Sequence, residues 1–183
     1  MTPEIRAFFT LMLTRNIAFV LFIGLLLPTI AGTSVKATFP VALKHATAVL
    51  IAALVGLAAS AILPASLHFA EPALFFLLTL PIIRLLQAWG ELKGEWAGIP
   101  RSMLAYIPYM GIMFHLQADN LAGMQSVTAA FGAAAGFFLA FVLVATASEQ
   151  IRLSEASPRF KGMATLFYAI AIFSLALAGF PFA

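Results

Sequence analysis

Long runs of apolar residues, separated by short polar stretches, dominate the pattern along this chain. A helix needs about 20 apolar residues to cross the roughly 30 Å hydrocarbon core of a bilayer, and a backbone in lipid must satisfy its own polar groups. The pattern therefore predicts an all-α integral membrane protein with about six transmembrane helices. The candidate spans are residues 8–30, 41–63, 73–89, 102–115, 127–147 and 163–182.

Two of these runs are interrupted. The first contains Arg15 and Asn16, and the fourth is short and holds Pro108 and Gly111. Proline removes a backbone donor from a helix, and a charge inside a span is costly in lipid. Spans one and four are therefore predicted to be broken or re-entrant helices, although Arg15 also fits a side chain that snorkels to the interface.

The composition agrees with lipid as the solvent. Hydrophobic residues make up 63% of the 183 residues, charged residues make up 9%, and the mean hydropathy is +1.04. Soluble domains carry about 25% charged residues, so a soluble globular protein is excluded. The length suits a single transmembrane domain over residues 1–183. The absence of cysteine excludes disulfides, thiolate catalysis and Cys-ligated metal centres.

The charged residues are distributed unequally between alternate loops. One set of connections holds Lys36, Lys44, Lys93, Arg101, Arg152, Arg159 and Lys161. The other set holds only His68, Glu71 and Asp119. Cytoplasmic loops carry an excess of Lys and Arg, so the bias predicts a multi-pass protein of the bacterial inner membrane with both termini on the non-cytoplasmic side, Arg6 being the exception. The same bias explains the net charge of +3 without a nucleic-acid partner.

Small residues recur at every fourth position in spans two and five. Such rows let helix backbones approach closely in lipid. The predicted helix-packing residues are Gly56, Ser60, Gly132 and Gly136. Because the two interrupted spans lie three helices apart, the pattern predicts two inverted three-helix repeats, at about residues 1–95 and 96–183, whose broken helices meet near the midplane. Chance similarity between two Ala- and Leu-rich halves is the alternative.

Several short patches of sequence carry a resemblance to a known family. In the C-terminal third they are Gln125-Ser126, Phe131-Gly132-Ala133-Ala134-Ala135-Gly136-Phe137, Glu149-Gln150-Ile151-Arg152, Pro158-Arg159-Phe160-Lys161-Gly162, and Ser174-Leu175-Ala176 with Gly179-Phe180. In the N-terminal half they are Asn16 with Phe22-Ile23-Gly24-Leu25, followed further on by Arg101 with Pro108. Together they resemble RnfA and its relatives NqrD and NqrE, six-span subunits of the Rnf and Nqr ion-translocating oxidoreductases. The resemblance implies an inverted repeat, outward termini and a place among other integral membrane subunits.

The chain departs from that family at its metal ligands. In the family each broken helix presents a cysteine, and paired subunits hold an iron–sulfur centre inside the membrane. The matching positions here are Leu26 and about Phe114, which offer no donor to iron, whereas iron–sulfur clusters need soft thiolates. We therefore expect a cysteine-free divergent paralogue that binds no iron–sulfur centre and no other cofactor on its own.

A few polar residues within or beside the spans are candidates for a polar pathway. They are Arg84, Gln87, Glu91 and His115. The first three share one helical face, which fits an ion pair or a snorkelling cluster as well as an ion or proton pathway. His115 titrates near neutral pH in model compounds, so a ligand or proton-relay role stands beside a structural one. No catalytic set or metal-ligand spacing stands out in the sequence.

These observations lead to one main expectation and two alternatives. The main expectation is a non-catalytic integral membrane subunit of an Rnf- or Nqr-like redox complex, acting in helix packing and assembly and in shaping an ion or quinone route. The first alternative is a stand-alone small transporter or channel whose pathway is lined by the broken helices with His115 or Arg84. The second is a subunit that stabilises an unrelated photosynthetic or respiratory membrane complex.

Overall fold

The computed structural model describes residues 2–20, 24, 27, 34–96, 98–119, 121–154 and 163–179. The helices in these ranges are α1 (Pro3–Phe9), the π-helical turn η1 (Thr10–Thr14), α2 (Ile17–Val20), α4 (Val35–Ile62), the 3-10 helix η2 (Ala65–Ala70), α5 (Glu71–Ala88), α6 (Arg101–Leu104), α7 (Tyr106–Ala118), α8 (Met124–Leu153) and α9 (Met163–Ala178). Two short strands, β1 (Glu95–Trp96) and β2 (Ile99–Pro100), pair antiparallel.

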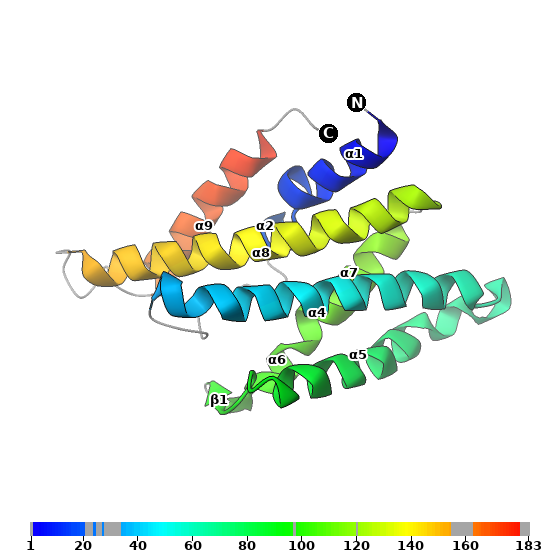
Figure 1. Cartoon of the computed structure of the whole chain (residues 1–183), viewed down its shortest axis with the longest axis horizontal. Coiled ribbons are helices and arrows are strands. Elements are labelled where there is room, and N and C mark those ends of the chain that lie inside the picture. Colours follow the sequence, from blue (N-terminus) through cyan, green and yellow to red (C-terminus); the bar gives the residue numbers. More distant parts are fainter. Residues whose placement is uncertain are drawn as a thin grey trace.

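Two long helices, α4 and α8, lie side by side and antiparallel at the centre of the molecule (Figure 1). At 1.5 Å per residue, the 28 residues of α4 and the 30 residues of α8 are about 42 and 45 Å long. Most of their buried residues are alanine or glycine. The carboxylate of Glu149 in α8 also accepts a 2.8 Å hydrogen bond from the backbone N–H of Val35, and so satisfies a donor that the start of α4 leaves open.

Three helical segments are long and apolar enough to cross a membrane. They are Val35–Ile62, Ser66–Ala88 and Met124–Leu153, which correspond to predicted spans two, three and five. The sixth predicted span forms the shorter α9, and spans one and four are divided among shorter helices. The largely helical class is thus confirmed for the described residues. Six complete crossings stay a prediction.

The first predicted span packs on α8 through two glycines. A Cβ atom at Gly132 would lie 2.3 Å from the backbone oxygen of Phe8. A Cβ atom at Gly136 would lie 2.8 Å from the backbone oxygen of Met12. Real Cβ atoms do not approach backbone oxygens this closely, so α1 and η1 touch α8 in a way that only glycine allows.

The fourth predicted span packs on α4 through another glycine. A Cβ atom at Gly56 would lie 2.6 Å from Cγ of Met113 in α7. Helix α5 packs against both α4 and α7, and α9 packs against α8 and α2. The hydroxyl of Ser174 in α9 donates a 3.2 Å hydrogen bond to the carbonyl of Phe19 in α2. The α4–α8 pair is therefore the surface on which the other helices assemble.

The two long helices extend beyond the apolar runs that predicted them. Helix α4 begins at Val35 rather than at residue 41, because Ser34 caps it by accepting a 3.3 Å hydrogen bond from the N–H of Ala37. Helix α8 continues to Leu153 rather than ending at residue 147. Apolar runs therefore locate the middle of each helix, whereas caps and polar end residues decide where the helix begins and ends.

The bundle has two polar ends, which we name after one residue at each. The Glu91 end contains the start of α4, the connection between α5 and α6, and the end of α8 (Figure 1). The Asp119 end contains the end of α4, η2 and the connection between α7 and α8. The basic residues assigned to the cytoplasmic side from sequence and present at the Glu91 end are Lys36, Lys44, Lys93, Arg101 and Arg152. Arg159 and Lys161 lie outside the described residues.

We expect Gly132→Ala and Gly136→Ala to destabilise the folded chain. The added methyl group would meet the backbone of α1 and η1, which cannot move aside as a flexible side chain can, and overpacking of this kind costs about 1–3 kcal/mol. Circular dichroism in detergent should show melting temperatures lower by roughly 2–4 °C per kcal/mol. Gly179→Ala is the control, because its Cβ would lie 3.5 Å from the nearest atom. Equal melting of all three variants would contradict the close approach.

Candidate functional site

The first and fourth predicted spans meet inside the bundle at Gly24 and at Pro108, which lies in the first turn of α7. Gly24 has a φ angle of +79°, in the left-handed region that favours glycine. A Cβ atom on Gly24 would lie 2.8 Å from Cβ of Pro108 and 2.8 Å from the ring of Phe137. Pro108 and Phe137 are themselves buried. Apolar groups therefore fill the junction between the two spans.

Asn16 organises the break in the first span. Its side chain is fully buried. The amide Nδ2 donates 2.8 Å hydrogen bonds to the carbonyls of Met12 and Gly136. The amide Oδ1 accepts hydrogen bonds of 3.0 and 3.4 Å from the N–H groups of Ala18 and Phe19. Asn16 thus caps the start of α2 and joins η1 and α2 to α8 by hydrogen bonds.

A buried polar pair joins α4 to α7. Nδ1 of His45 lies 2.5 Å from the hydroxyl oxygen of Tyr109. The imidazole ring also stacks on Phe141 of α8, with 5.4 Å between ring centroids. His45 and Tyr109 are both buried, so the hydrogen bond gives each polar group a partner in an apolar interior. The pair therefore links the two central helices to α7.

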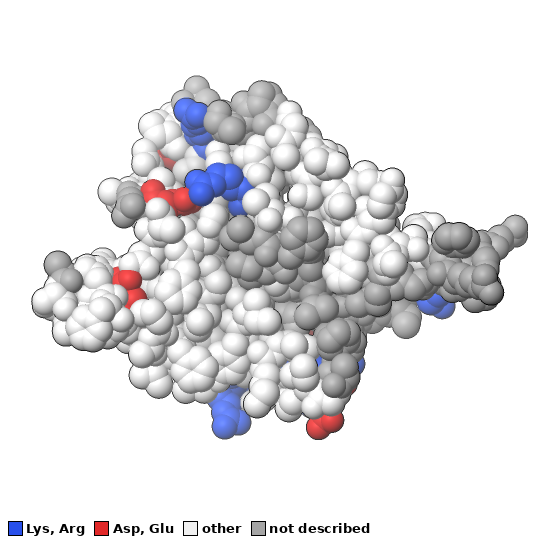
Figure 2. Space-filling view, turned by 180° about the vertical axis from the view of Figure 1, so that it is seen from behind, with Lys and Arg blue, Asp and Glu red and all other residues white. Residues whose placement is uncertain are grey.

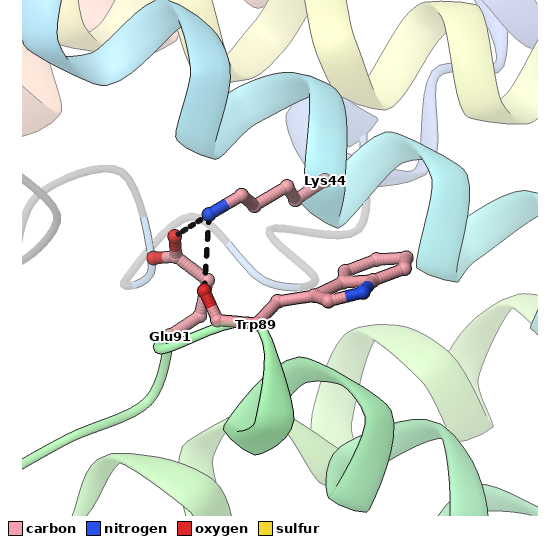
Figure 3. A network of polar contacts seen from close by, with 3 residues as sticks. All are labelled: Lys44, Trp89 and Glu91. Atoms are coloured by element: carbon pink, nitrogen blue, oxygen red, sulfur yellow. Dashed lines mark hydrogen bonds and ion pairs between the residues drawn. The ribbon is translucent and has the colours of Figure 1, made fainter.

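The Glu91 end is held by one lysine that reaches from α4 to the end of α5. Nζ of Lys44 donates a 2.8 Å hydrogen bond to Oε1 of Glu91 and a 3.1 Å hydrogen bond to the carbonyl of Trp89, as Figure 3 shows. A cation at the C-terminal end of a helix is favoured by the unpaired carbonyls there. The side chains of Lys44 and Glu91 are 39% and 17% exposed, so the ion pair contributes at most about 1 kcal/mol.

The Arg15 hollow is a cavity of about 270 Å³ at the Asp119 end, between α1, η1 and the α7–α8 connection. Its polar lining residues are Arg6, Thr10, Arg15, Asp119 and Gln125. Nη2 of Arg15 lies 2.8 Å from Oδ1 of Asp119, whose side chain is only 9% exposed. The hollow therefore combines a well-buried carboxylate with two guanidinium groups.

The Ser60 hollow, of about 420 Å³, lies at the same end and also borders the α7–α8 connection. Its polar lining residues are Ser60, His68, Gln117 and Ser126. The buried carboxylate of Glu71 binds two of these residues. Nδ1 of His68 lies 2.5 Å from its Oε1, and the amide of Gln117 donates a hydrogen bond to its Oε2. These contacts tie η2 and the start of α5 to α7.

The pathway candidates on or after α5 form two separate contacts. Nη1 of Arg84 donates a 3.3 Å hydrogen bond to Oε1 of Gln87 at an exposed position. Glu91 instead pairs with Lys44 of α4. The structure therefore brings Arg84 to Gln87 and leaves Glu91 in a contact of its own.

His115 lies apart from the other three candidates. It belongs to the last turns of α7, close to the Asp119 end. The 18 residues of α5, about 27 Å at 1.5 Å per residue, separate that end from Glu91. Nε2 of His115 is buried and has no hydrogen-bond partner within the described ranges. A polar pathway through all four residues stays a prediction.

The predicted helix-packing residues divide between close helix contacts and the lining of a hollow. Gly56, Gly132 and Gly136 lie at the close helix contacts described above. Ser60 lines its hollow, and its Oγ lacks a hydrogen-bond partner among the residues described.

The two positions that the sequence resemblance matches to metal ligands differ in what the structure describes. Leu26 lies outside the described residues. Phe114 packs edge-to-face on Phe75, with ring centroids 5.0 Å apart. No group of His, Asp and Glu suited to a metal ion occurs in the described part of the chain.

Several of the polar contacts above were not foreseen from the sequence. The bond from Asn16 to Gly136 joins residues 120 positions apart, and no local pattern could reveal it. The pairing of His45 with Tyr109 joins residues 64 positions apart, and it too has no local signal. For His68 and Glu71, the i, i+3 spacing was an available signal, because such residues are neighbours on a helical surface.

No protein-family model and no curated protein matches this chain. Function is therefore inferred from the residues and their geometry.

We expect Asn16→Ala to cost more stability than any exposed substitution. It removes the acceptor of two buried N–H groups at the start of α2 and the bridge from η1 to α8, and a buried unsatisfied group costs about 1–3 kcal/mol. Unfolding by SDS titration should show a loss of about 2–4 kcal/mol. Asn16→Ser can still cap α2 but cannot reach α8, so its loss of stability should lie between zero and that of Asn16→Ala. Gln150→Ala, at an exposed position, should unfold like the wild type. Equal losses for Asn16→Ser and Asn16→Ala would refute separate capping and bridging roles.

Proposed function

We propose that this chain is a non-catalytic integral membrane subunit of a larger redox complex of the Rnf and Nqr type. In this proposal it consists of two inverted three-helix repeats, binds no iron–sulfur centre of its own, and acts in assembly and in shaping an ion or quinone route. The single observation that carries it is the contact of Gly24 with Pro108, where the two interrupted spans meet. An inverted repeat places its broken helices together in this way.

The packing of the remaining helices supports the two-repeat arrangement. The first span lies on α8 through Gly132 and Gly136, and the fourth lies on α4 through Gly56. In each half, the interrupted span thus packs through glycine against the long helix of the other half, and the two long helices pack against each other. With three spans per half, equivalent helices of the two halves would cross the membrane in opposite directions. The equivalent helices α4 and α8 do run antiparallel (Figure 1).

The contents of the junction support a role without an electron carrier. Gly24, Pro108 and Phe137 fill the space where the first and fourth spans meet, and none of them offers a ligand to iron. Phe114, at one family ligand position, packs on Phe75. A subunit of this kind contributes surface for assembly, and large apolar side chains such as Leu77 and Leu175 remain 59% and 75% exposed for lipid or other integral membrane subunits.

A small transporter is the second candidate, favoured by two buried polar atoms near the Asp119 end. Ser60 Oγ and His115 Nε2 are buried near the Asp119 end and have no hydrogen-bond partner among the described residues, and unpaired buried polar groups are costly unless something binds them. Reconstituted liposomes that carry ions or organic anions only when His115 is intact would favour this function over the subunit proposal.

Isolation of the tagged chain from its native membrane tests the main proposal. We expect other integral membrane subunits of a redox complex to co-purify, because the apolar faces of α5 and α9 then contact proteins as well as lipid. Iron content and EPR spectra of the complex should be unchanged when this chain alone is removed by mild detergent. An iron–sulfur signal from the isolated chain, or a stable monomer without partners, would overturn the proposal.

The proposed orientation can be tested with single cysteines, because the chain has none of its own. Lys93→Cys lies at the Glu91 end and Ala122→Cys at the Asp119 end, and both positions are exposed. If basic loops face the cytoplasm, a membrane-impermeant maleimide added to right-side-out vesicles should label Ala122→Cys and spare Lys93→Cys. Inverted vesicles should give the opposite result. Labelling of both positions from one side would exclude the orientation.

A further inference from the structure

The Arg15 hollow is lined by more positive than negative side chains. Arg6 and Arg15 each bring a positive charge and Asp119 a negative one, so the three leave a formal charge of +1. The ion pair of Arg15 with Asp119 uses Nη2, and a guanidinium has five N–H donors. Asp119 therefore holds one guanidinium in place at the hollow while leaving donors on it for a second anion.

Arg6 is the other source of positive charge in the Arg15 hollow. Among the described residues, no carboxylate lies within ion-pair distance of it. Thr10 and Gln125 add polar groups to the same lining. Two planar guanidinium groups beside one small cavity match a tetrahedral anion, because each can donate two parallel N–H bonds to phosphate oxygens.

The size and surroundings of the Arg15 hollow restrict what it could hold. Sites for whole small molecules enclose about 300–1,000 Å³, and this hollow encloses about 270 Å³, which suits a headgroup-sized ligand. Ile5 of α1 and Val127 of α8, the helices that flank the hollow, expose apolar side chains at 48% and 36%. In Figure 2, basic and acidic side chains lie side by side on one shoulder of the molecule, next to a broad uncharged surface.

We propose that the Arg15 hollow binds a phosphate-bearing anion through Arg6 and Arg15. An anionic phospholipid is the source that the surroundings favour, because arginines at the end of apolar helices lie at headgroup depth while the adjoining apolar surface meets acyl chains. The inference goes beyond the proposed redox complex and does not depend on it. An isolated snorkelling arginine would explain Arg15, but it leaves unexplained why Arg6 lines the same cavity without a carboxylate partner.

Native mass spectrometry of the delipidated full chain in detergent tests the proposal. Phosphatidylglycerol and phosphatidylcholine with the same acyl chains are added separately, and inorganic phosphate is the soluble competitor. We expect the chain to retain more phosphatidylglycerol than phosphatidylcholine. Arg6→Gln and Arg15→Gln should each weaken phosphatidylglycerol binding about tenfold, because each loses charge-assisted hydrogen bonds to the phosphate. Arg84→Gln, at an exposed position on α5, is the matched control and should bind like the wild type.

The outcomes separate the possible sources of the anion. Displacement of the lipid by millimolar inorganic phosphate, with the same loss in both variants, would support the phosphate site and overturn its lipid source. Equal binding of the two lipids, unchanged in Arg6→Gln, would overturn the site altogether. Arg6→Gln is decisive here, because Arg15→Gln also breaks the ion pair with Asp119 and so affects the fold directly.

Discussion

Close approach of helix backbones is the constraint on which this structure depends. In lipid the hydrophobic effect does not hold one apolar helix against another, so packing at short range and a few polar contacts must do so. Gly132 and Gly136 let α1 and η1 lie directly on α8, and Gly56 lets α7 lie on α4. The alanine-rich sides of α4 and α8 extend the same principle to the central pair.

Polar side chains act where this backbone packing is interrupted. The amide nitrogen of Asn16 donates to carbonyls of η1 and of Gly136 in α8, at a position where glycine permits the close approach. Its amide oxygen accepts from the first N–H groups of α2. His45 and Tyr109 form the corresponding buried bridge between α4 and α7. Each bridge gives polar groups partners that the apolar interior does not supply, so these polar side chains attach one helix to another.

The two ends of the bundle differ in what their polar groups do. At the Glu91 end, the carboxylate of Glu149 and the ammonium of Lys44 are taken up by contacts that join one helix terminus to another. At the Asp119 end, polar groups border two hollows, and the charge of Arg6 is not matched by a carboxylate within the described ranges. The Asp119 end therefore has space and polar groups for a ligand. The junction of Gly24 with Pro108 has none, because protein side chains fill it.

The apolar runs and the polar residues between them determined where the long helices lie and where the first span breaks. Helix position and helix breaks both depend on residues that are neighbours in the chain. They could not determine which helices touch. The partners of Asn16, His45 and Gly24 lie far away in sequence, and an apolar helix carries little information about which of its faces meets another helix. Only the tertiary structure separated Glu91 from Arg84 and His115 and brought Arg6, Arg15 and Asp119 to one hollow, since such contacts are set by how helices pack and not by their order along the chain.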